Sequence, residues 1–349
     1  MADMTTTDVF LREQLLDRRQ RLEFVVAGSR EHSDLVQLLD QLDSALERMN
    51  KGTYGICDFC HEDIGKEGLL TNPLTRFCLE HLSPAERSFL EEDLELASQI
   101  QREMLPKPHL VFGGWEIAYH YKPLGAVSGD YCDVVTRDGE DQSLLLILGD
   151  ASGKGLAASM LMAHLRAIFR ALNSASLPLT RLVEQAGRIF RESAMAPYFA
   201  TLVCCRANAS GTIELCNAGH CRPLLLCGGK MTRLEASGVP LGLFCDGRYS
   251  AEEVQLDAGD TVLLYTDGLS EARNSAEDEY GEARLEKLVS DCQSLPAPEL
   301  VGACLHDVTE FCAGVPLRDD LTVMAVRRLR SISCERVAFT DSMPPDCWR

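Results

Sequence analysis

Acidic residues stand at the ends of four short apolar segments between residues 130 and 320. They are Asp130 in SGDYCDVV, Asp150 in LLLILGDASGKG, Asp267 in TVLLYTDG, and Asp319 with Asp320 in RDDLTVMAV. Each segment is rich in leucine and β-branched residues and is bounded by Gly, Asp or Thr, which predicts a buried strand. Because an unpaired carboxylate is costly to bury, acids that recur at strand ends should share a cation. Oxygen ligands suit Mg²⁺ or Mn²⁺.

The overall composition limits the classes of protein to consider. At 349 residues the chain suits two or three domains, and 46% hydrophobic with 25% charged residues is ordinary globular composition. The net charge of −19 argues against general binding of nucleic acid or anionic membranes. The N-terminus lacks the pattern of a secretion signal, and no apolar stretch is long enough to span a membrane. We therefore expect a cytoplasmic protein.

Fifteen cysteines would suit a disulfide scaffold, but their number is odd and the chain is long. Several of them, such as Cys204, Cys205 and Cys216, lie inside apolar segments, where a thiol behaves as a small hydrophobic group. We expect mostly free thiols in a reducing compartment.

Residues 1–50 are predicted to form a helical or coiled-coil segment. Apolar residues recur there at three- and four-residue spacing, with polar residues between them. The clearest run is Leu35, Leu38, Leu39, Leu42, Leu46 and Met49. An earlier helix, interrupted near Gly28–Ser29, would complete a helical hairpin.

Residues 51–82 contain two ligand pairs, Cys57-x-x-Cys60 and Cys78-x-x-His81. Two pairs of this kind supply the four ligands of a tetrahedral, structural Zn²⁺ site. With Gly52, Tyr54 and Gly55, the segment resembles the DksA/TraR-type zinc finger, although His81 replaces that family's last cysteine. Members of that family act on RNA polymerase through acids at a coiled-coil tip. We interpret the acids beside this finger, Asp40 and Asp43, as a solvated helix face.

Residues 83–106 are predicted to form a single linker helix. Ser83-Pro84 is a helix start signal, and Pro106 ends the helix. The apolar positions lie close to a 3.5-residue repeat; they are Leu90, Leu94, Ala97, Ile100 and Met104. Two interpretations remain open: a connector packed on its neighbour, or a helix that forms a homodimer or transmits a signal.

Two familiar phosphate-binding patterns are present only superficially. GDASGKG has the wrong glycine spacing for a nucleotide P-loop, and glycine follows its lysine. The pattern Cys216-x₅-Arg222 matches the bare signature of cysteine phosphatases, but Pro223 and a new apolar segment follow where a helix should begin. We interpret Asn-Ala-Gly-His, which ends at His220, as a hairpin turn whose histidine stabilises the turn or neighbours the site.

A series of segments from residue 109 to residue 328 resembles, in order, the SpoIIE/RsbU branch of the PPM metal-dependent serine/threonine phosphatases. They are SGDYCDVV, GDASGKGLAASMLM, FATLVCC, IELCNAGHCRPLLL, GVPLGLF, DTVLLYTDGLSEARN, EYGEARL and RDDLTVMAV. The resemblance implies an α+β fold, an α–β–β–α sandwich of two antiparallel sheets.

The same resemblance implies the ligands of two Mn²⁺ or Mg²⁺ ions. They are Asp130, Asp150, Asp267, Asp319 and the backbone carbonyl of Ala151, with Asp133 and Asp320 as adjacent acids able to ligate or to hold water. Two such cations activate a water molecule for attack on a phosphoryl group, so no covalent nucleophile is needed.

The chain is thus predicted to comprise a helical segment (1–50), a zinc finger (51–82), a linker helix (83–106), a phosphatase domain (107–328) and a tail (329–349). Its expected activity is hydrolysis of phosphoserine or phosphothreonine on a protein. By resemblance, that substrate would be an anti-sigma-factor antagonist in sigma-factor partner switching. The alternative is a DksA-like regulator that binds RNA polymerase and carries an inactive phosphatase domain.

Overall fold

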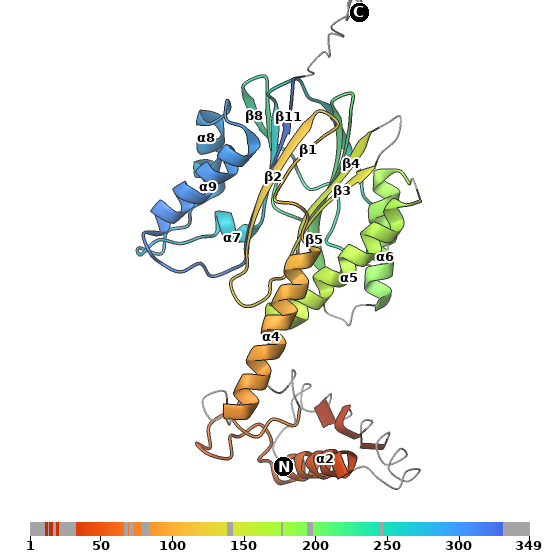
Figure 1. Cartoon of the computed structure of the whole chain (residues 1–349), viewed down its shortest axis with the longest axis vertical. Coiled ribbons are helices and arrows are strands. Elements are labelled where there is room, and N and C mark those ends of the chain that lie inside the picture. The colour runs from red at the N-terminus through yellow and green to blue at the C-terminus, as the bar shows by residue number, and fades with distance from the viewer. Residues whose placement is uncertain are drawn as a thin grey trace, which may run out of the picture. The chain divides into compact units, whose positions relative to one another are not determined.

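The computed structural model describes residues 11–12, 14–16, 19–20, 33–65, 69, 73–78, 84–137, 142–175, 177–193, 198–244 and 247–330 (Figure 1). His81, the predicted break at Gly28–Ser29 and the tail after Arg330 lie outside these residues. The chain divides into two compact units, residues 1–93 and 94–349. Each unit is described by itself.

The first unit is built on helix α2 (Ser33–Lys51). Its inner face buries Leu42, Ala45 and Leu46 against Leu15, as the apolar spacing predicts. The helix ends at a glycine: Gly52 has a φ of 71°, and its N–H donates to the carbonyl of Met49. This turn leads the chain directly into the first cysteine pair.

Helix α4 (Pro84–Met104) lies within the range predicted for the linker helix, and the division between the two units falls inside it. Leu90, Leu94 and Ile100 are exposed on this helix, whereas Ser98 and Gln101 are buried. Three of the five apolar positions of the predicted seam are therefore exposed, whereas Ala97 and Met104 are half-buried.

The second unit contains two antiparallel sheets. The six-stranded sheet has the order β1-β2-β11-β10-β7-β8, with strands His109–Phe112, Trp115–Lys122, Leu321–Arg328, Thr261–Tyr265, Leu224–Cys227 and Lys230–Arg233. The five-stranded sheet has the order β3-β4-β5-β6-β9, with strands Asp130–Arg137, Ser143–Ala151, Ala200–Asn208, Thr212–Ala218 and Glu252–Gln255.

Helices cover the outer faces of both sheets (Figure 1). α5 (Gly155–Asn173) and α6 (Leu179–Ser193) pack on the five-stranded sheet. α7 (Asp267–Ser270), α8 (Glu282–Asp291) and α9 (Ala297–Cys312) pack on the six-stranded sheet. A third core fills the space between the sheets, where inward residues such as Leu148 and Val203 meet Met324. The predicted α–β–β–α sandwich is confirmed.

Among the described helices, only α5 is long and apolar enough to pass a length-and-composition test for a membrane span. Met162, Leu165 and Phe169 of this helix are buried in the core that it shares with the five-stranded sheet. Packing inside the domain thus accounts for one face of α5, while Leu156 and Met160 of the same helix are exposed.

Two local interpretations of the sequence are wrong. Asp133 is fully buried on the helix-covered face of its sheet, where Arg170 holds both of its oxygens at 2.7 and 2.8 Å. Since side chains alternate along a strand, it faces away from Asp130 and cannot join the acidic site. In addition, β6 and β7 belong to different sheets, so the segment ending at His220 is a crossover between sheets and not a hairpin turn.

Candidate metal centre and active site

The site begins with a row of polar side chains on the five-stranded sheet. Asp130 of β3 is the direct partner of Asp150 of β4, and Asp150 is in turn the direct partner of Thr201 of β5. Direct partners in an antiparallel ladder share a face. Two residues along each strand, Cys132, Leu148 and Val203 lie in the core between the sheets. The polar row therefore continues this inward face at the end of the sandwich.

The six-stranded sheet supplies the remaining acids at the same end. Asp267 follows β10 as the first residue of α7, and Asp319 and Asp320 immediately precede β11. Direct bonds cross between the sheets here, because the hydroxyls of Thr266 and Thr322 both donate to Oδ2 of Asp130. The topology thus brings together acids that lie far apart in the sequence.

Burial, together with repulsion between neighbouring carboxylates, favours the protonated form of several of these acids. Burial, followed by the charges of Asp267, Asp319 and Asp320, raises the pKa of Asp150 to about 7. Burial also raises the pKa of Asp130 well above its ordinary value, although the two threonine hydroxyls partly oppose this shift. The pKa of Asp267 is raised in the same direction, by burial and then by Asp319. The cluster is therefore short of positive charge.

Lys154 supplies the only ammonium group that the described residues place in hydrogen-bond contact with this cluster. Its Nζ lies 2.8 Å from Oδ2 of Asp319 and 2.9 Å from the carbonyl of Arg318. The bond to Asp319 raises the pKa of Lys154, so the ammonium remains charged. The side chain is 61% exposed, so its charge is well screened by solvent.

Asp320 holds the backbone that leads to Asp130. Its Oδ1 accepts the N–H of Leu124 at 2.6 Å, and its Oδ2 accepts the N–H of Gly129 at 2.8 Å. Ser128, between these two residues, exchanges two hydrogen bonds with the side-chain amide of Gln101 on α4, at 2.8 and 2.9 Å. The loop before Asp130 is therefore fixed from both sides.

One glycine of the site is required by a close approach of two backbones. A Cβ atom at Gly268 would lie 1.9 Å from the carbonyl oxygen of Asp320. No side chain fits in that space. The Asp-Gly pair at 267–268 is thus explained by the packing of α7 against the start of β11.

The predicted ligands differ in how closely their atoms converge. Ala151 lies at the end of β4, next to Asp150, and its N–H donates to the carbonyl of Gly129 at 3.1 Å. Among the described residues, a group of three metal-ligating atoms all within 4.8 Å of one another occurs only at Cys57, Cys60 and Cys78. The aspartates interact electrostatically but do not close to that separation.

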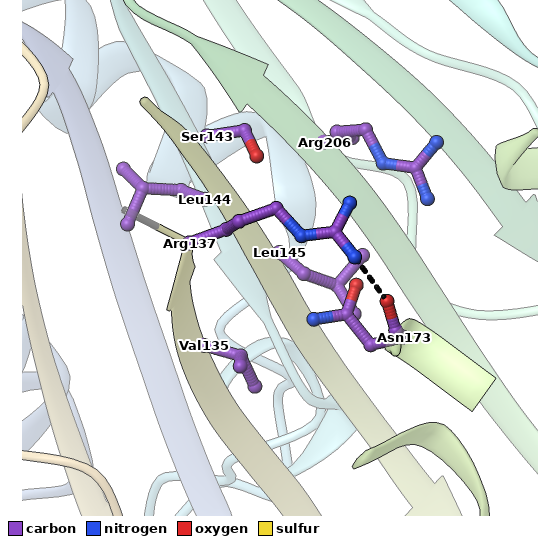
Figure 2. Close-up of a pocket in the computed structure, with 7 residues that line it drawn as sticks. All are labelled: Val135, Arg137, Ser143, Leu144, Leu145, Asn173 and Arg206. Carbon is purple, nitrogen blue, oxygen red and sulfur yellow. Dashed lines mark hydrogen bonds between the residues drawn. The ribbon is translucent and has the colours of Figure 1, made fainter. Parts of the chain in front are cut away.

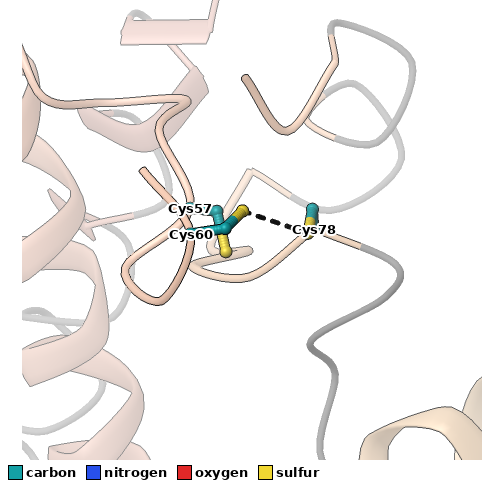
Figure 3. Close-up of side chains that lie close together, drawn as sticks. All are labelled: Cys57, Cys60 and Cys78. Carbon is teal, nitrogen blue, oxygen red and sulfur yellow. Dashed lines mark hydrogen bonds between the residues drawn. The ribbon is translucent and has the colours of Figure 1, made fainter. Parts of the chain in front are cut away.

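The three sulfur atoms of the first unit form a compact group (Figure 3). The Sγ atoms of Cys60 and Cys78 are 3.7 Å apart. Burial tends to raise the pKa of the Cys57 thiol, but backbone hydrogen bonds at Cys60, Cys78 and Phe59 outweigh it and lower this pKa to about 6. Cys57 is therefore ready to act as a thiolate ligand at neutral pH.

The second unit also has a partly open pocket of about 100 Å³, at the opposite end of β3 and β4 from the acids (Figure 2). Arg137 and Arg206 line it. The guanidinium of Arg137 donates to the carbonyl of Asn173 at the end of α5, at 2.9 Å. This arginine therefore caps a helix C-terminus, which explains its position without a ligand.

Cys216 does not have the surroundings of a catalytic thiol. It is buried in β6, and burial raises its pKa to about 11. Arg222 is occupied by ion pairs with Glu235 and Glu282. The rejection of a cysteine-phosphatase mechanism on sequence grounds agrees with this geometry.

Sequence reasoning missed several residues that organise the site: Thr266, Thr322, Lys154, Gln101 and Thr201. The sequence offered a signal for Thr266 and Thr322, because both are polar residues close to the acids at the ends of apolar segments. No signal in the sequence pairs Gln101 or Thr201 with its partner, because those contacts depend on how the sheets and α4 meet.

The comparison with known proteins agrees with this geometry. The sequence model of the family described as Stage II sporulation protein E (SpoIIE) matches residues 140–329, more than half of the chain. The chain belongs to the SpoIIE family. Members of this family are thus the proper reference for the acidic cluster, which lies largely within the matched range.

Individual relatives are more distant. Phosphoserine phosphatase RsbU of Bacillus subtilis is 25% identical over 244 residues, which cover 68% of this chain and 71% of RsbU. Protein IcfG of Synechocystis is 24% identical over 266 residues, which cover 68% of this chain but only 41% of that protein. Among solved structures, the SiaA-PP2C domain of Pseudomonas aeruginosa is similar with a TM-score of 0.59 and 22% identity, covering 70% of this chain and 98% of that domain. This similarity supports the fold.

Proposed function

We propose that this protein is a metal-dependent protein serine/threonine phosphatase. The observation that carries the proposal is the convergence of Asp130 and Asp150 from one sheet with Asp267 and Asp319 from the other, in a member of the SpoIIE family. RsbU is named a phosphoserine phosphatase, and it aligns with two thirds of the chain. Phosphoserine is accordingly the first substrate to test.

The residues of the cluster fit divalent cations. The donors are carboxylates, which suit Mn²⁺ and Mg²⁺, and a bound cation would offset the burial and mutual repulsion that raise the pKa values of Asp130, Asp150 and Asp267. Asp130, Asp150, Asp267, Asp319 and the carbonyl of Ala151 would hold two cations. When bound, these cations lower the pKa of a water molecule and neutralise the phosphoryl group under attack.

The chain's own residues have distinct tasks in this proposal. Thr266 and Thr322 orient the Asp130 carboxylate, and Asp320 orients the loop before it, so Asp320 acts by positioning and not as a ligand. Lys154 stands at the exposed rim, where its ammonium would attract an incoming phosphate dianion.

The proposed substrate class is based on the similarity to RsbU. The proposed substrate is a phosphorylated protein in the cytoplasm, of the kind that sigma-factor partner switching uses, by the resemblance to RsbU. The strong negative charge of the chain disfavours nucleic acid as a partner.

A turnover assay with a phosphoserine peptide tests this proposal. Phosphate release should require Mn²⁺ or Mg²⁺ and should stop when a chelator is added. Asp267→Asn should abolish release, while Asp257→Asn, the same exchange at an exposed acid outside the cluster, should behave as wild type. Equal turnover with and without metal, or full activity of Asp267→Asn, would rule the proposal out.

We further propose that Cys57, Cys60, Cys78 and His81 bind one structural Zn²⁺, in a finger that spans residues 51–82. The support is the three-sulfur group and the thiolate character of Cys57. Elemental analysis of the purified protein should give about one zinc per chain. A zinc-free protein with intact first-unit structure would contradict this.

We also propose that α4, the linker helix, mediates a homodimer. The exposed positions Leu90, Leu94 and Ile100 support this, because a second copy could bury them in a coiled-coil seam. Leu94→Glu should shift the protein toward monomer in sedimentation velocity. A wild-type protein that is monomeric at every concentration tested would leave α4 as a connector only.

A further inference from the structure

The segment that crosses from the five-stranded to the six-stranded sheet is unusually well fixed. It begins at Asn217, near the end of β6 (Thr212–Ala218), and passes through His220 to β7 (Leu224–Cys227). The Asn217 side chain accepts the N–H of His220 at 2.8 Å and donates to the carbonyl of His220 at 3.2 Å. Gly219 has a φ of 71°, and a Cβ there would lie 2.7 Å from Pro240. The backbone of His220 therefore has a single, defined position.

The imidazole of His220 connects this crossover to the row of acids. It is buried, with 8% of its surface exposed, and Nδ1 lies 2.8 Å from Oγ1 of Thr201. Thr201 is the direct ladder partner of Asp150, on the same inward face. One ring nitrogen is thus tied to the neighbour of an acid on the five-stranded sheet.

The other ring nitrogen has no such partner. Nε2 is buried and has no hydrogen-bond partner within standard geometry among the described residues. The nearby backbone carbonyl of Tyr265 still acts on the ring electrostatically, and Tyr265 stands two residues before Asp267. Burying a ring nitrogen without a hydrogen-bond partner costs folding free energy. A functional reason for placing a histidine here should therefore be sought.

The surroundings determine the protonation of the ring. Burial lowers the pKa of His220 to about 4, so the imidazole is neutral. The neutral ring carries one proton, on Nδ1 or on Nε2. Nδ1 and Oγ1 of Thr201 share a hydrogen bond in either tautomer, with the imidazole as acceptor when the proton is on Nε2.

We propose that His220 is a positioning residue that sets the separation between Asp150, the ladder partner of Thr201, and Asp267, which follows Tyr265 by two residues. The inference rests on the proposed function, since it concerns how those acids are presented to a divalent cation. This role of His220 differs from a purely structural one. It requires the hydrogen bond to the Thr201 hydroxyl, which links His220 to the neighbour of Asp150, whereas a structural role would require only that the side chain fill its volume.

Thr201→Val tests the link with little change of shape, and Thr201→Ser is the matched control that restores the hydroxyl. The measurements are Mn²⁺ binding to metal-stripped protein by electron paramagnetic resonance, kcat and KM on a phosphoserine peptide, and thermal unfolding in chelator. Loss of an outer-sphere partner typically weakens metal affinity or activity about 10- to 100-fold. We expect that loss in Mn²⁺ affinity and kcat for Thr201→Val, with KM unchanged and with Thr201→Ser close to wild type.

His220→Asn provides a second route, because its amide oxygen can replace Nδ1 while it cannot reach toward Tyr265. It should bind Mn²⁺ more weakly than wild type, and adding Thr201→Val should not add a further full loss, since both changes interrupt one connection. Additive losses would overturn the inference.

The remaining outcomes are also decisive. If Thr201→Val binds Mn²⁺ and turns over peptide as wild type does, the inference is wrong. If it lowers only the unfolding temperature, His220 is structural and the inference is again wrong. If wild type itself neither binds Mn²⁺ nor releases phosphate, the proposed function fails. That failure is seen in wild type alone, so it is distinguishable from failure of the inference, which is seen as a difference between variants.

Discussion

The protein contains two groups of candidate metal ligands that are built in opposite ways. Cys57, Cys60 and Cys78 come from neighbouring turns of one short segment, and their sulfur atoms already lie within 4.8 Å of one another. The aspartates come from the ends of strands in two sheets, and their carboxylates do not converge to that extent. One group is local in sequence, and the other exists only after the sandwich has formed.

Charge explains the difference in convergence. Thiols can approach one another in the neutral form and even share a weak hydrogen bond, as Cys60 and Cys78 do. Carboxylates repel unless protonated or neutralised, which the raised pKa values of Asp130 and Asp150 make visible. The comparison teaches that a metal at the cysteines would support folding, whereas metals at the aspartates would complete a site that the fold has already placed.

The largest effect should come from removing one acid. Asp150→Asn should lower kcat by more than the roughly 10- to 100-fold expected for an outer-sphere partner, because Asp150 lies among all the other acids. The chain should remain folded, since the amide is similar in size and uncharged. Steady-state kinetics with Mn²⁺, alongside circular dichroism, provides the test. Unfolding of the variant would show that the acid site, like the cysteine site, supports the fold.

A second prediction concerns the cysteine group. Cys57→Ser should lose the zinc and unfold the first unit, because structural zinc in small fingers contributes on the order of 10 kcal/mol of binding free energy. Metal analysis and hydrogen exchange, resolved by segment, would follow both changes. If exchange across residues 33–65 matched wild type after zinc was lost, the proposed contrast between the two groups would disappear.

The pH dependence of stability should distinguish the metal-free from the metal-bound protein. Asp150 has a folded pKa of about 7, raised by burial and by the neighbouring acids, whereas in the unfolded chain it titrates near its ordinary value. The folded state therefore binds an extra proton between those two values, and the free energy of unfolding falls as pH rises through that window. Mn²⁺ needs the deprotonated acids, so its stabilisation should grow with pH.

Thermal unfolding from pH 5 to pH 8, in chelator and in Mn²⁺, measures both trends. Asp150→Asn is the control and should flatten the slope in chelator. A metal-free protein whose stability rises steadily over this range would show that the acids are not the dominant titrating groups.

The smallest effect on kcat is expected at Cys216, which we do not consider a nucleophile. Cys216→Ser should change kcat by less than about twofold, because a buried thiol with a pKa near 11 does not act as a nucleophile at neutral pH. Phosphatase kinetics on the folded variant decide the point. Complete loss of turnover in a folded variant would bring the thiol mechanism back.

Much of the fold and the acid set could be predicted because their signals are local. Each aspartate adjoins a recognisable apolar strand, and the helices at 155–173 and 297–312 show clear apolar spacing. What could not be predicted depends on which sheet a strand joins. The Asn-Ala-Gly-His segment reads as a hairpin turn in sequence, but β6 and β7 enter different sheets. The same ambiguity concealed the contact between Thr201 and His220.

Asp133 shows the limit of reading acids by proximity. It stands three residues after Asp130, yet an odd spacing along a strand directs it to the opposite face. There the two bonds from Arg170 fasten α5 to β3. The alternation of side chains along the strand would have assigned Asp133 to the correct face. That assignment requires knowing that residues 130–137 form one continuous strand.

The two threonines that reach Asp130 have a consequence for its coordination chemistry. Their hydroxyls both donate to Oδ2, which uses the lone pairs of that oxygen. Oδ1 is then the oxygen that remains available, so in the proposed site Asp130 would offer a cation one oxygen. Thr266 and Thr322 would thereby limit how Asp130 can bind a cation, although neither residue would touch the cation itself.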